Sequence, residues 1–309
     1  MANSNPKILV TGGNAGIGFA LCKQLASRGC HVYLCSRSVE RGEAAVKALL
    51  DENPAAKVEL VQCDTADDAS VAAAAAAVKA SLCGETLFAI VNNAGVNRGA
   101  DIINTNVYGP KRVCEAFAPL WQASGGRIVN LGSGGGPSFV VKHPQHRELM
   151  CSWDTTWEQC EAMLRTEPWS AGANVGPPDI SAAEWTCYCC SKAALHVYTR
   201  VLAKQYPDAL CSTGELGTAP HVPSSRLLAS VHSPCRPVHA YLDGAPSRLR
   251  TPPHSLAWLH RDWHDARLRL HQAARRRHRL DPPRAVGRAR RLGPLLRLRR
   301  APITAARDA

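Results

Sequence analysis

A tyrosine and a lysine four residues apart are the pair in this chain most suited to proton transfer. Tyr188 and Lys192 belong to the run Tyr-Cys-Cys-Ser-Lys. Residues at positions i and i+4 share one face of an α-helix, so the phenol and the ammonium would be neighbours. A nearby cation stabilises a phenolate. We therefore expect Lys192 to lower the pKa of Tyr188, so that the phenol can donate or accept a proton near neutral pH.

A second set of residues has the spacing of a phosphate-binding turn. It lies between an apolar run at 7–10 and an apolar-periodic stretch at 17–25. This order of strand, glycine-rich turn and helix lets backbone amides approach a pyrophosphate at the N-terminus of the helix. Taken alone, the glycines would also fit an ordinary tight turn. The residues expected to bind a dinucleotide are Thr11, Gly12, Asn14, Gly16, Ile17 and Gly18.

Arg37 lies just beyond the β-rich segment 31–35. In dinucleotide-binding folds, an acidic residue at this place binds the ribose 2′-hydroxyl of NAD. An arginine suits a 2′-phosphate instead, which predicts NADP(H) as the cofactor, with Arg41 assisting. The alternative for each arginine is a solvated helix face.

The elements that must position these residues alternate along the chain. Parallel strands buried on both faces are expected, because helices of this length follow each apolar run. The prediction is an α/β fold with a doubly wound, Rossmann-type sheet, whose ligands bind at the carboxyl ends of its strands. Strands are expected at 7–10, 31–35, 58–61, 87–91 and 127–131, and helices at 17–25, 40–50, 71–82 and 107–118.

Together these motifs resemble the short-chain dehydrogenase/reductase family over residues 1 to about 208. Asn92-Asn93-Ala94-Gly95 follows the fourth expected strand and is similar to the family's Asn-Asn-Ala-Gly signature. The start of the second helix, at 38–46, resembles the carbonyl reductase branch. The 55 positions between Ser133 and Tyr188 resemble that branch's helical insertion, here about 137–184.

The resemblance implies NADPH-dependent reduction of a ketone, aldehyde or quinone, with Tyr188 protonating the carbonyl oxygen. It implies that Lys192 bonds the nicotinamide ribose and that Ser133 hydrogen-bonds the substrate oxygen. Asn106, only 13 positions after Asn93, would hold a proton-relay water. By the same resemblance, further cofactor contacts come from Asp64, Thr65, Asn93, Ala94 and Gly95.

The insertion carries several tryptophans. Such inserts can cover the edge through which relatives oligomerise, so the resemblance implies a monomer. The tryptophans expected to pack the insertion are Trp153, Trp157, Trp169 and Trp185.

Residues 209–309 depart from the family's pattern. The net charge of +12 comes from this segment, which holds 19 arginines, no lysine and 6 acidic residues. The strand, Pro-Gly turn and closing segment of the family cannot be read in it. One interpretation is a basic tail that binds nucleic acid through phosphate contacts.

The favoured interpretation of this segment is an out-of-frame or retained-intron translation near 208–257. Shifting the codons of 257–266 by one base permits a Pro-Gly-aromatic-Ile-Ala-Thr-Gly-Met-Thr turn. We expect 209–309 to be a largely disordered, low-complexity tail, because it is highly charged, rich in proline and poor in aromatic residues. The competing functional hypothesis is a non-catalytic nucleotide-binding module, whose substrate segment is missing.

The composition argues against secretion, metal binding and membrane insertion. The 13 cysteines are irregularly spaced, and no secretory signal segment is apparent. The cluster of Cys187, Cys189 and Cys190 has no second Cys or His pair at zinc spacing to accompany it. No apolar run has the length of roughly 20 residues that a transmembrane helix needs. We expect a cytoplasmic protein with reduced thiols, no metal, no membrane partner and a small carbonyl compound as its substrate.

Overall fold

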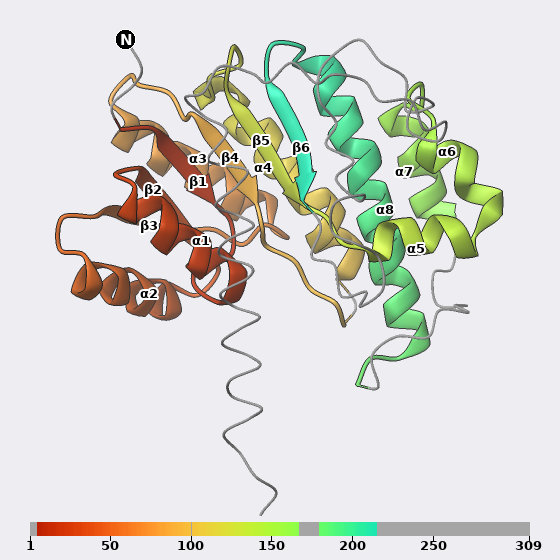
Figure 1. The fold of residues 1–309 in the computed structure, drawn as a ribbon, viewed down its shortest axis with the longest axis horizontal. Coiled ribbons are helices and arrows are strands. Elements are labelled where there is room, and N and C mark those ends of the chain that lie inside the picture. Colours follow the sequence, from red (N-terminus) through yellow and green to blue (C-terminus); the bar gives the residue numbers. More distant parts are fainter. Residues whose placement is uncertain (1–4, 100, 167–178, 215–309) are drawn as a thin grey trace, which may run out of the picture. The chain divides into compact units, whose positions relative to one another are not determined.

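The computed structural model describes residues 5–99, 101–166 and 179–214 (Figure 1). All of them belong to one unit, Met1–Arg269, and the second unit, Leu270–Ala309, lies outside the described residues. Trp169 and most of the predicted tail, from 215 onward, lie outside them too.

A parallel sheet of six strands carries the fold. Its order is β3-β2-β1-β4-β5-β6, so the chain winds outward in both directions from the β1–β4 pair, as a doubly wound sheet requires. The predicted fold class is confirmed. The strands are β1 (Lys7–Val10), β2 (His31–Ser36), β3 (Lys57–Gln62), β4 (Ala89–Asn92), β5 (Arg127–Leu131) and β6 (Leu210–Gly214).

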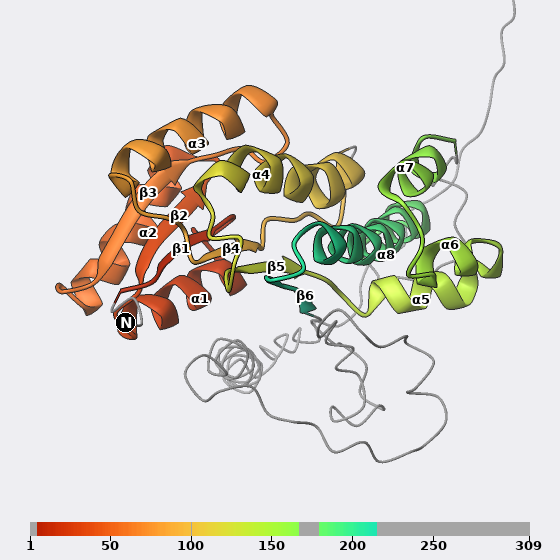
Figure 2. The ribbon, with the colours of Figure 1, turned by 90° about the horizontal axis from the view of Figure 1, so that it is seen from above.

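Helices cover both faces of the sheet, because successive strand residues point to opposite sides. Ile8 and Val10 pack into a core with α1 and α2, whereas Leu9 packs into a second core with α3, α4 and α8. Figure 2 shows α3 and α4 on one side of the sheet and α1 on the other. These helices are α1 (Gly16–Ser27), α2 (Val39–Glu52), α3 (Asp68–Leu82), α4 (Gly109–Phe117) and α8 (Ala182–Gln205).

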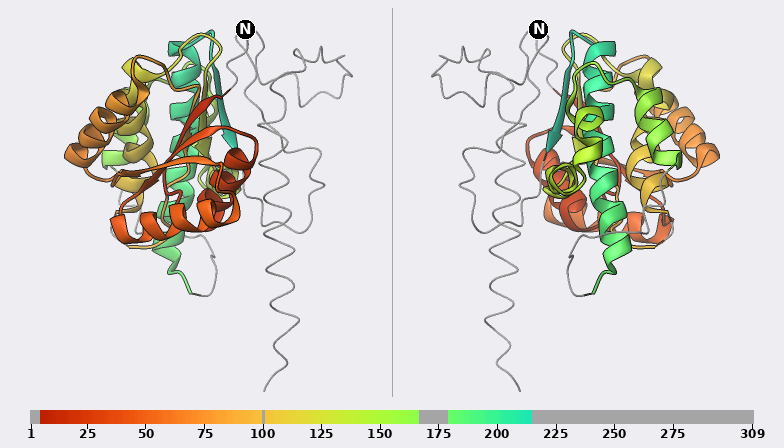
Figure 3. Two further views of the ribbon diagram at one scale, coloured as in Figure 1. Left: turned by 90° about the vertical axis from the view of Figure 1, so that its left-hand side faces the viewer. Right: turned by 90° about the vertical axis from the view of Figure 1, so that its right-hand side faces the viewer.

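The predicted insertion is helical where the structure describes it. Three helices, α5 (Gly135–Lys142), α6 (Arg147–Cys151) and α7 (Trp157–Thr166), pack against α8 (Figure 3, right). Trp157 is buried and meets the Tyr198 ring edge to face at 5.4 Å, as expected for a packing residue. Trp153 is 39% exposed, and the Lys204 ammonium lies 5.8 Å from the centre of its ring. Its part in packing the insertion stays a prediction.

Strand β6 corrects the predicted boundary at 208. Its short segment Leu-Cys-Ser-Thr-Gly has little apolar periodicity of its own. It is a strand because it pairs with β5 in parallel, from Arg127 opposite Leu210 to Leu131 opposite Gly214. The sheet therefore continues six residues beyond the predicted end of the domain.

The single helix expected at 107–118 is divided into three consecutive helical elements. A π-helical turn, η1 (Asn104–Tyr108), precedes α4, and a 3-10 turn, η2 (Ala118–Leu120), follows it. A second 3-10 turn, η3 (Pro144–His146), joins α5 to α6.

A buried chain of polar side chains fixes α8 across the sheet. Asn92 on β4 donates its Nδ2 hydrogen to Asn130 Oδ1 on β5 at 2.8 Å. Asn130 donates in turn to Thr199 Oγ1 on α8 at 2.9 Å, and Thr199 donates to the Leu195 carbonyl. All three side chains are buried, so each bond forms where water cannot substitute for a lost partner.

No described helix combines the length and apolar character that crossing a membrane would need. Within the same residues, no cluster of three His, Cys, Asp or Glu side chains is arranged to hold a metal ion.

We predict that Asn130→Ala lowers the free energy of unfolding by about 1–3 kcal/mol, because it leaves buried polar atoms of its neighbours without partners. Urea denaturation of the cofactor-free protein measures the change. Asn97→Ala, at an exposed asparagine, is the control and should change it by less than about 0.5 kcal/mol. An equal effect of the two substitutions would contradict a structural role of the buried chain.

Candidate active site

The glycine-rich turn joins β1 to α1 in the geometry of an anion cradle. Gly12 has a φ of +64°, and a Cβ on Gly18 would lie 2.2 Å from the Gly12 carbonyl oxygen. A Cβ on Gly16 would meet no atom within 4 Å, so open space lies in front of the turn. Ala15, the N-cap of α1, has no capping side chain, and the first turn of the helix has no acidic residue. The first-turn amides are therefore suited to an anion.

Thr11 and Asn93 tie this turn to the neighbouring strand. Thr11 Oγ1 accepts the backbone N–H groups of Asn93 and Ala94, each at 3.0 Å. The Asn93 side chain donates to the carbonyls of Thr11 at 2.8 Å and Gly12 at 3.1 Å. These bonds bridge the carboxyl ends of β1 and β4, at the switch point of the sheet.

Two arginines lie at the open end of β2. Arg37 follows the strand, and Arg41 lies in the first turn of α2, where its backbone N–H donates to the N-cap Ser38. Both side chains are exposed. Across the described ranges of the chain, neither guanidinium has a recorded ion pair or hydrogen bond, so both are available to an anionic ligand.

Asp64 and Thr65 follow β3 at the same edge of the sheet. The Asp64 carboxylate accepts the Ala66 N–H at 3.0 Å, which shapes its own turn. Thr65 is buried, and a Cβ on Gly109 would lie 3.2 Å from its side chain. The Thr65 side chain therefore points toward α4. If Thr65 contacts the adenine, it would do so through its backbone.

Tyr188, Ser133 and Lys192 meet at the carboxyl end of β5. The Tyr188 hydroxyl lies close enough to the Ser133 hydroxyl for that group to lower its pKa. Lys192 Nζ lies 5.7 Å from the centre of the Tyr188 ring and donates to the Leu131 carbonyl at 2.7 Å. Helix α8 thus brings phenol and ammonium together, as their spacing predicts.

Burial dominates the ionisation of this pair. Desolvation lowers the pKa of Lys192 to about 8. Desolvation also raises the pKa of Tyr188 above its usual value, and the nearby Ser133 hydroxyl opposes that shift only in part. The expected net lowering of the Tyr188 pKa is therefore wrong, because desolvation by burial outweighs any effect of the nearby ammonium. The Lys192 ammonium is directed at the Leu131 carbonyl rather than at the phenol oxygen.

Asn106 joins the same cluster from η1. Its side chain accepts the Val96 N–H and donates to the Val96 carbonyl, both at 2.8 Å. It also donates to Ser191 Oγ at 3.0 Å. A Cβ on Gly95 would lie 3.2 Å from Asn106 Oδ1 and 3.6 Å from Lys192 Nζ. The short segment after Asn93 therefore still places Asn106 beside the pair on α8.

Three further residues lie at this site, and of these sequence reasoning named only Trp185, as a residue that packs the insertion. Ser191 connects Asn106 to α8 and donates to the Tyr188 carbonyl at 2.7 Å. Its place inside the Tyr-x-x-x-Lys run could have identified it as a residue of the site from the sequence. Trp185 stacks on Tyr188 with ring centres 5.2 Å apart, one helical turn earlier. His196 lies one turn after Lys192, and its buried Nε2 has no hydrogen-bond partner.

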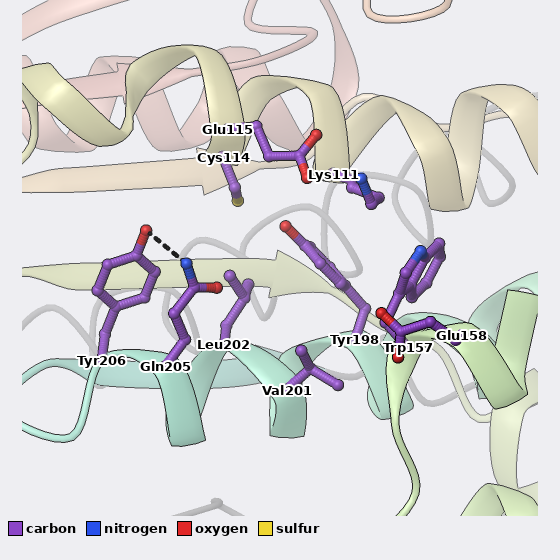
Figure 4. A pocket seen from close by; sticks show the side chains of 10 residues that line it. All are labelled: Lys111, Cys114, Glu115, Trp157, Glu158, Tyr198, Val201, Leu202, Gln205 and Tyr206. Carbon is purple, nitrogen blue, oxygen red and sulfur yellow. Dashed lines mark hydrogen bonds and ion pairs between the residues drawn. The ribbon is translucent and has the colours of Figure 1, made fainter.

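The structure also has a cavity of about 240 Å³, which is lined by residues of α4, α7 and α8. In Figure 4 the Tyr198 hydroxyl points from α8 toward Cys114 and Glu115 on α4. Tyr206 and Trp157 contribute two further aromatic walls. None of the predicted catalytic or cofactor-binding residues lines this cavity, so the carboxyl edge of the sheet remains the candidate active site.

Comparisons with known proteins agree with this geometry. Residues 6–143 match the family model described as short chain dehydrogenase. A (+)-neomenthol dehydrogenase from Arabidopsis thaliana is 34% identical over 248 residues, covering 67% of this chain and 81% of that protein. A (-)-isopiperitenone reductase from Mentha piperita is 31% identical over 279 residues, covering 68% and 84%.

Two solved structures are similar in fold. Salutaridine reductase from Papaver somniferum has a TM-score of 0.57 at 28% identity, covering 68% of this chain and 85% of that one. Menthone neomenthol reductase from Mentha piperita has a TM-score of 0.56 at 30% identity, covering 68% and 89%. With the glycine turn, the Asn93 brace and the Tyr188–Lys192 pair in place at one edge of a doubly wound sheet, the chain belongs to the short-chain dehydrogenase/reductase family.

Proposed function

We propose that this protein reduces the carbonyl group of a small organic compound with NADPH, and that Tyr188 is the proton donor. The observation that carries the proposal is the placement of the Tyr188 phenol beside the buried Lys192 ammonium and the Ser133 hydroxyl at the end of β5. Two hydroxyls at one strand end can both bond a single carbonyl oxygen. That oxygen gains negative charge during reduction, so both bonds strengthen in the transition state.

The chain's own residues then handle the proton. Tyr188 gives its proton to the substrate oxygen, while Ser133 holds that oxygen in place. The raised pKa keeps Tyr188 protonated before the reaction, as a general acid requires. The Lys192 ammonium stabilises the phenolate left behind, and Asn106 with Ser191 holds the backbone around the pair.

The cofactor site fits an NADP-type dinucleotide. When bound, NADPH supplies the hydride that reduces the carbonyl carbon. The uncapped first turn of α1 would hold its pyrophosphate. The exposed guanidiniums of Arg37 and Arg41, which have no partner among the described residues, would bind the 2′-phosphate. Asn93, beside the glycine turn, and Gly95, near Lys192, would contact the cofactor between its pyrophosphate and its nicotinamide.

Relatives suggest the class of substrate. The names of the similar proteins specify neomenthol, isopiperitenone, menthone and salutaridine. We infer an alcohol–ketone pair of comparable kind for this chain, in which a ketone, NADPH and a proton give an alcohol and NADP⁺.

We predict that Tyr188→Phe abolishes turnover of a ketone panel, with a loss of at least about a hundredfold in kcat, because the proton donor is gone. NADPH affinity, measured by fluorescence titration, should change less than about threefold. Tyr206→Phe removes a tyrosine hydroxyl outside the site and serves as the control. Wild-type turnover in Tyr188→Phe would refute the assignment. NADPH binding without consumption by the unmutated chain would favour the non-catalytic binding module.

A second prediction concerns the choice of cofactor. Arg37→Asp should weaken NADPH binding by roughly tenfold to a hundredfold, because a charge-assisted contact is replaced by repulsion, while NADH binding is kept or improved. Arg147→Asp makes the same charge change on α6, at the opposite end of the sheet from α2, and should leave both affinities unchanged (Figure 1). Equal affinity of the unmutated protein for the two cofactors would argue against the role given to Arg37.

The lowered pKa of Lys192 predicts a pH dependence. The side chain is charged below about pH 8 and neutral above it. The kcat/KM for a ketone should therefore fall as pH rises through about 8, because the phenolate loses its stabilising cation. Lys192→Arg keeps the charge at higher pH, so any activity this variant retains should lack the fall near pH 8. An unchanged fall in the variant would assign the titration to another group.

A further inference from the structure

The indole of Trp185 is stacked on the ring of Tyr188. The two ring centres lie 5.2 Å apart and their planes are inclined by 21°. Both side chains are half-buried and pack against the same core, on the side of the sheet that holds α4 and α8. Aromatic pairs in an offset stack attract each other beyond the effect of the area they bury.

The Trp185 indole and the backbone of α5 both lie close to the Tyr188 ring. The orientation of the phenol decides whether its hydroxyl stays near that of Ser133, which acts on the pKa of Tyr188. A Cβ on Gly135 would lie 3.4 Å from Tyr188 Cε1, so the backbone of α5 approaches the ring closely. Trp185 and Gly135 together limit rotation of the phenol about its side-chain bonds.

The position of Trp185 is itself fixed by its neighbours on α8. Ser181 caps the helix, and its hydroxyl and the Glu184 side chain form a reciprocal capping box. Glu184 also accepts the Gly99 N–H at 2.9 Å, which links this first turn to the segment after β4. Arg98 pairs with Asp179 at 2.7 Å just before the cap. The turn that carries Trp185 is therefore tied at two points to the segment that leads to Asn106.

We propose that Trp185 is a positioning residue for Tyr188: its indole holds the phenol against Ser133 in the orientation needed for proton donation. This inference rests on the proposed function, since it assigns to Tyr188 the role of proton donor. No contact of the indole with substrate or cofactor is required.

The stack should also affect ionisation of the phenol. The indole contributes to the burial that raises the pKa of Tyr188. The other groups facing the phenol are Ser133 from the turn after β5 and Lys192 and Cys189 from α8, and Lys142 on α5 acts on Cys189. None of these is altered by a substitution at Trp185.

The test compares Trp185→Leu, which removes the stack, with Trp185→Phe, which keeps an aromatic ring there. In the full chain with NADPH and a ketone, Trp185→Leu should lower kcat about tenfold with KM changed less than about twofold, because only orientation is lost. Trp185→Phe should restore kcat to within about twofold of the unmutated protein. Trp153→Leu removes an indole outside the site and should have no effect.

A second measurement needs neither turnover nor cofactor. Phenolate absorbance is titrated with pH, and the step that disappears in Tyr188→Phe is assigned to Tyr188. In Trp185→Leu this step should move down by about one pH unit, because the phenol becomes more accessible to water. In Trp185→Phe it should stay close to its original position.

The two measurements separate failure of this inference from failure of the proposed function. A chain that reduces no ketone but shows the downward shift would refute the proposed function and support the Tyr188–Trp185 coupling. Unchanged kcat and an unchanged titration in Trp185→Leu would overturn the positioning role. Equal losses in the Leu and Phe variants would also overturn it, because the loss would then follow the indole's size rather than its stacking.

Discussion

The buried chain from Asn92 through Asn130 to Thr199 is the constraint on which the site depends. It joins two central strands to α8 by hydrogen bonds that burial makes obligatory. Because α8 carries both Tyr188 and Lys192, its placement across β5 decides where the phenol and ammonium stand relative to the end of that strand. A helix held only by apolar contacts could slide along the sheet with little penalty, whereas these paired amides specify one position.

Burial has opposite effects on stability and on chemistry at this edge of the sheet. Lys192 is held in its charged form at a desolvation penalty, which its bond to the Leu131 carbonyl offsets only in part. The same desolvation keeps Tyr188 protonated. A site tuned in this way suits donation of a proton to an oxygen that becomes negative, because the phenolate formed then lies beside a cation in a poorly hydrated setting.

Elements with strong local patterns were predictable, and elements defined by their partners were not. Strands β1 and β5 fall at their predicted bounds, because each has a core of consecutive apolar residues in a sheet covered on both faces. Strand β6 was missed, since its weak pattern becomes a strand only by pairing with β5. The direction of the Tyr188 pKa was also mispredicted, because helical spacing shows that Lys192 is near but not how far burial desolvates the phenol.

The order of motifs along the chain determined the family, the cofactor turn and the Tyr188–Lys192 pair, because each depends on spacing within one local element. Only the tertiary structure decided what surrounds them. It brought Asn106 to Ser191, which is 85 positions away in the sequence, and stacked Trp185 on the phenol. Such contacts depend on how helices and strands pack across the sheet. That packing is set by buried area and hydrogen-bond pairing between distant segments, and no periodicity within a single segment encodes it.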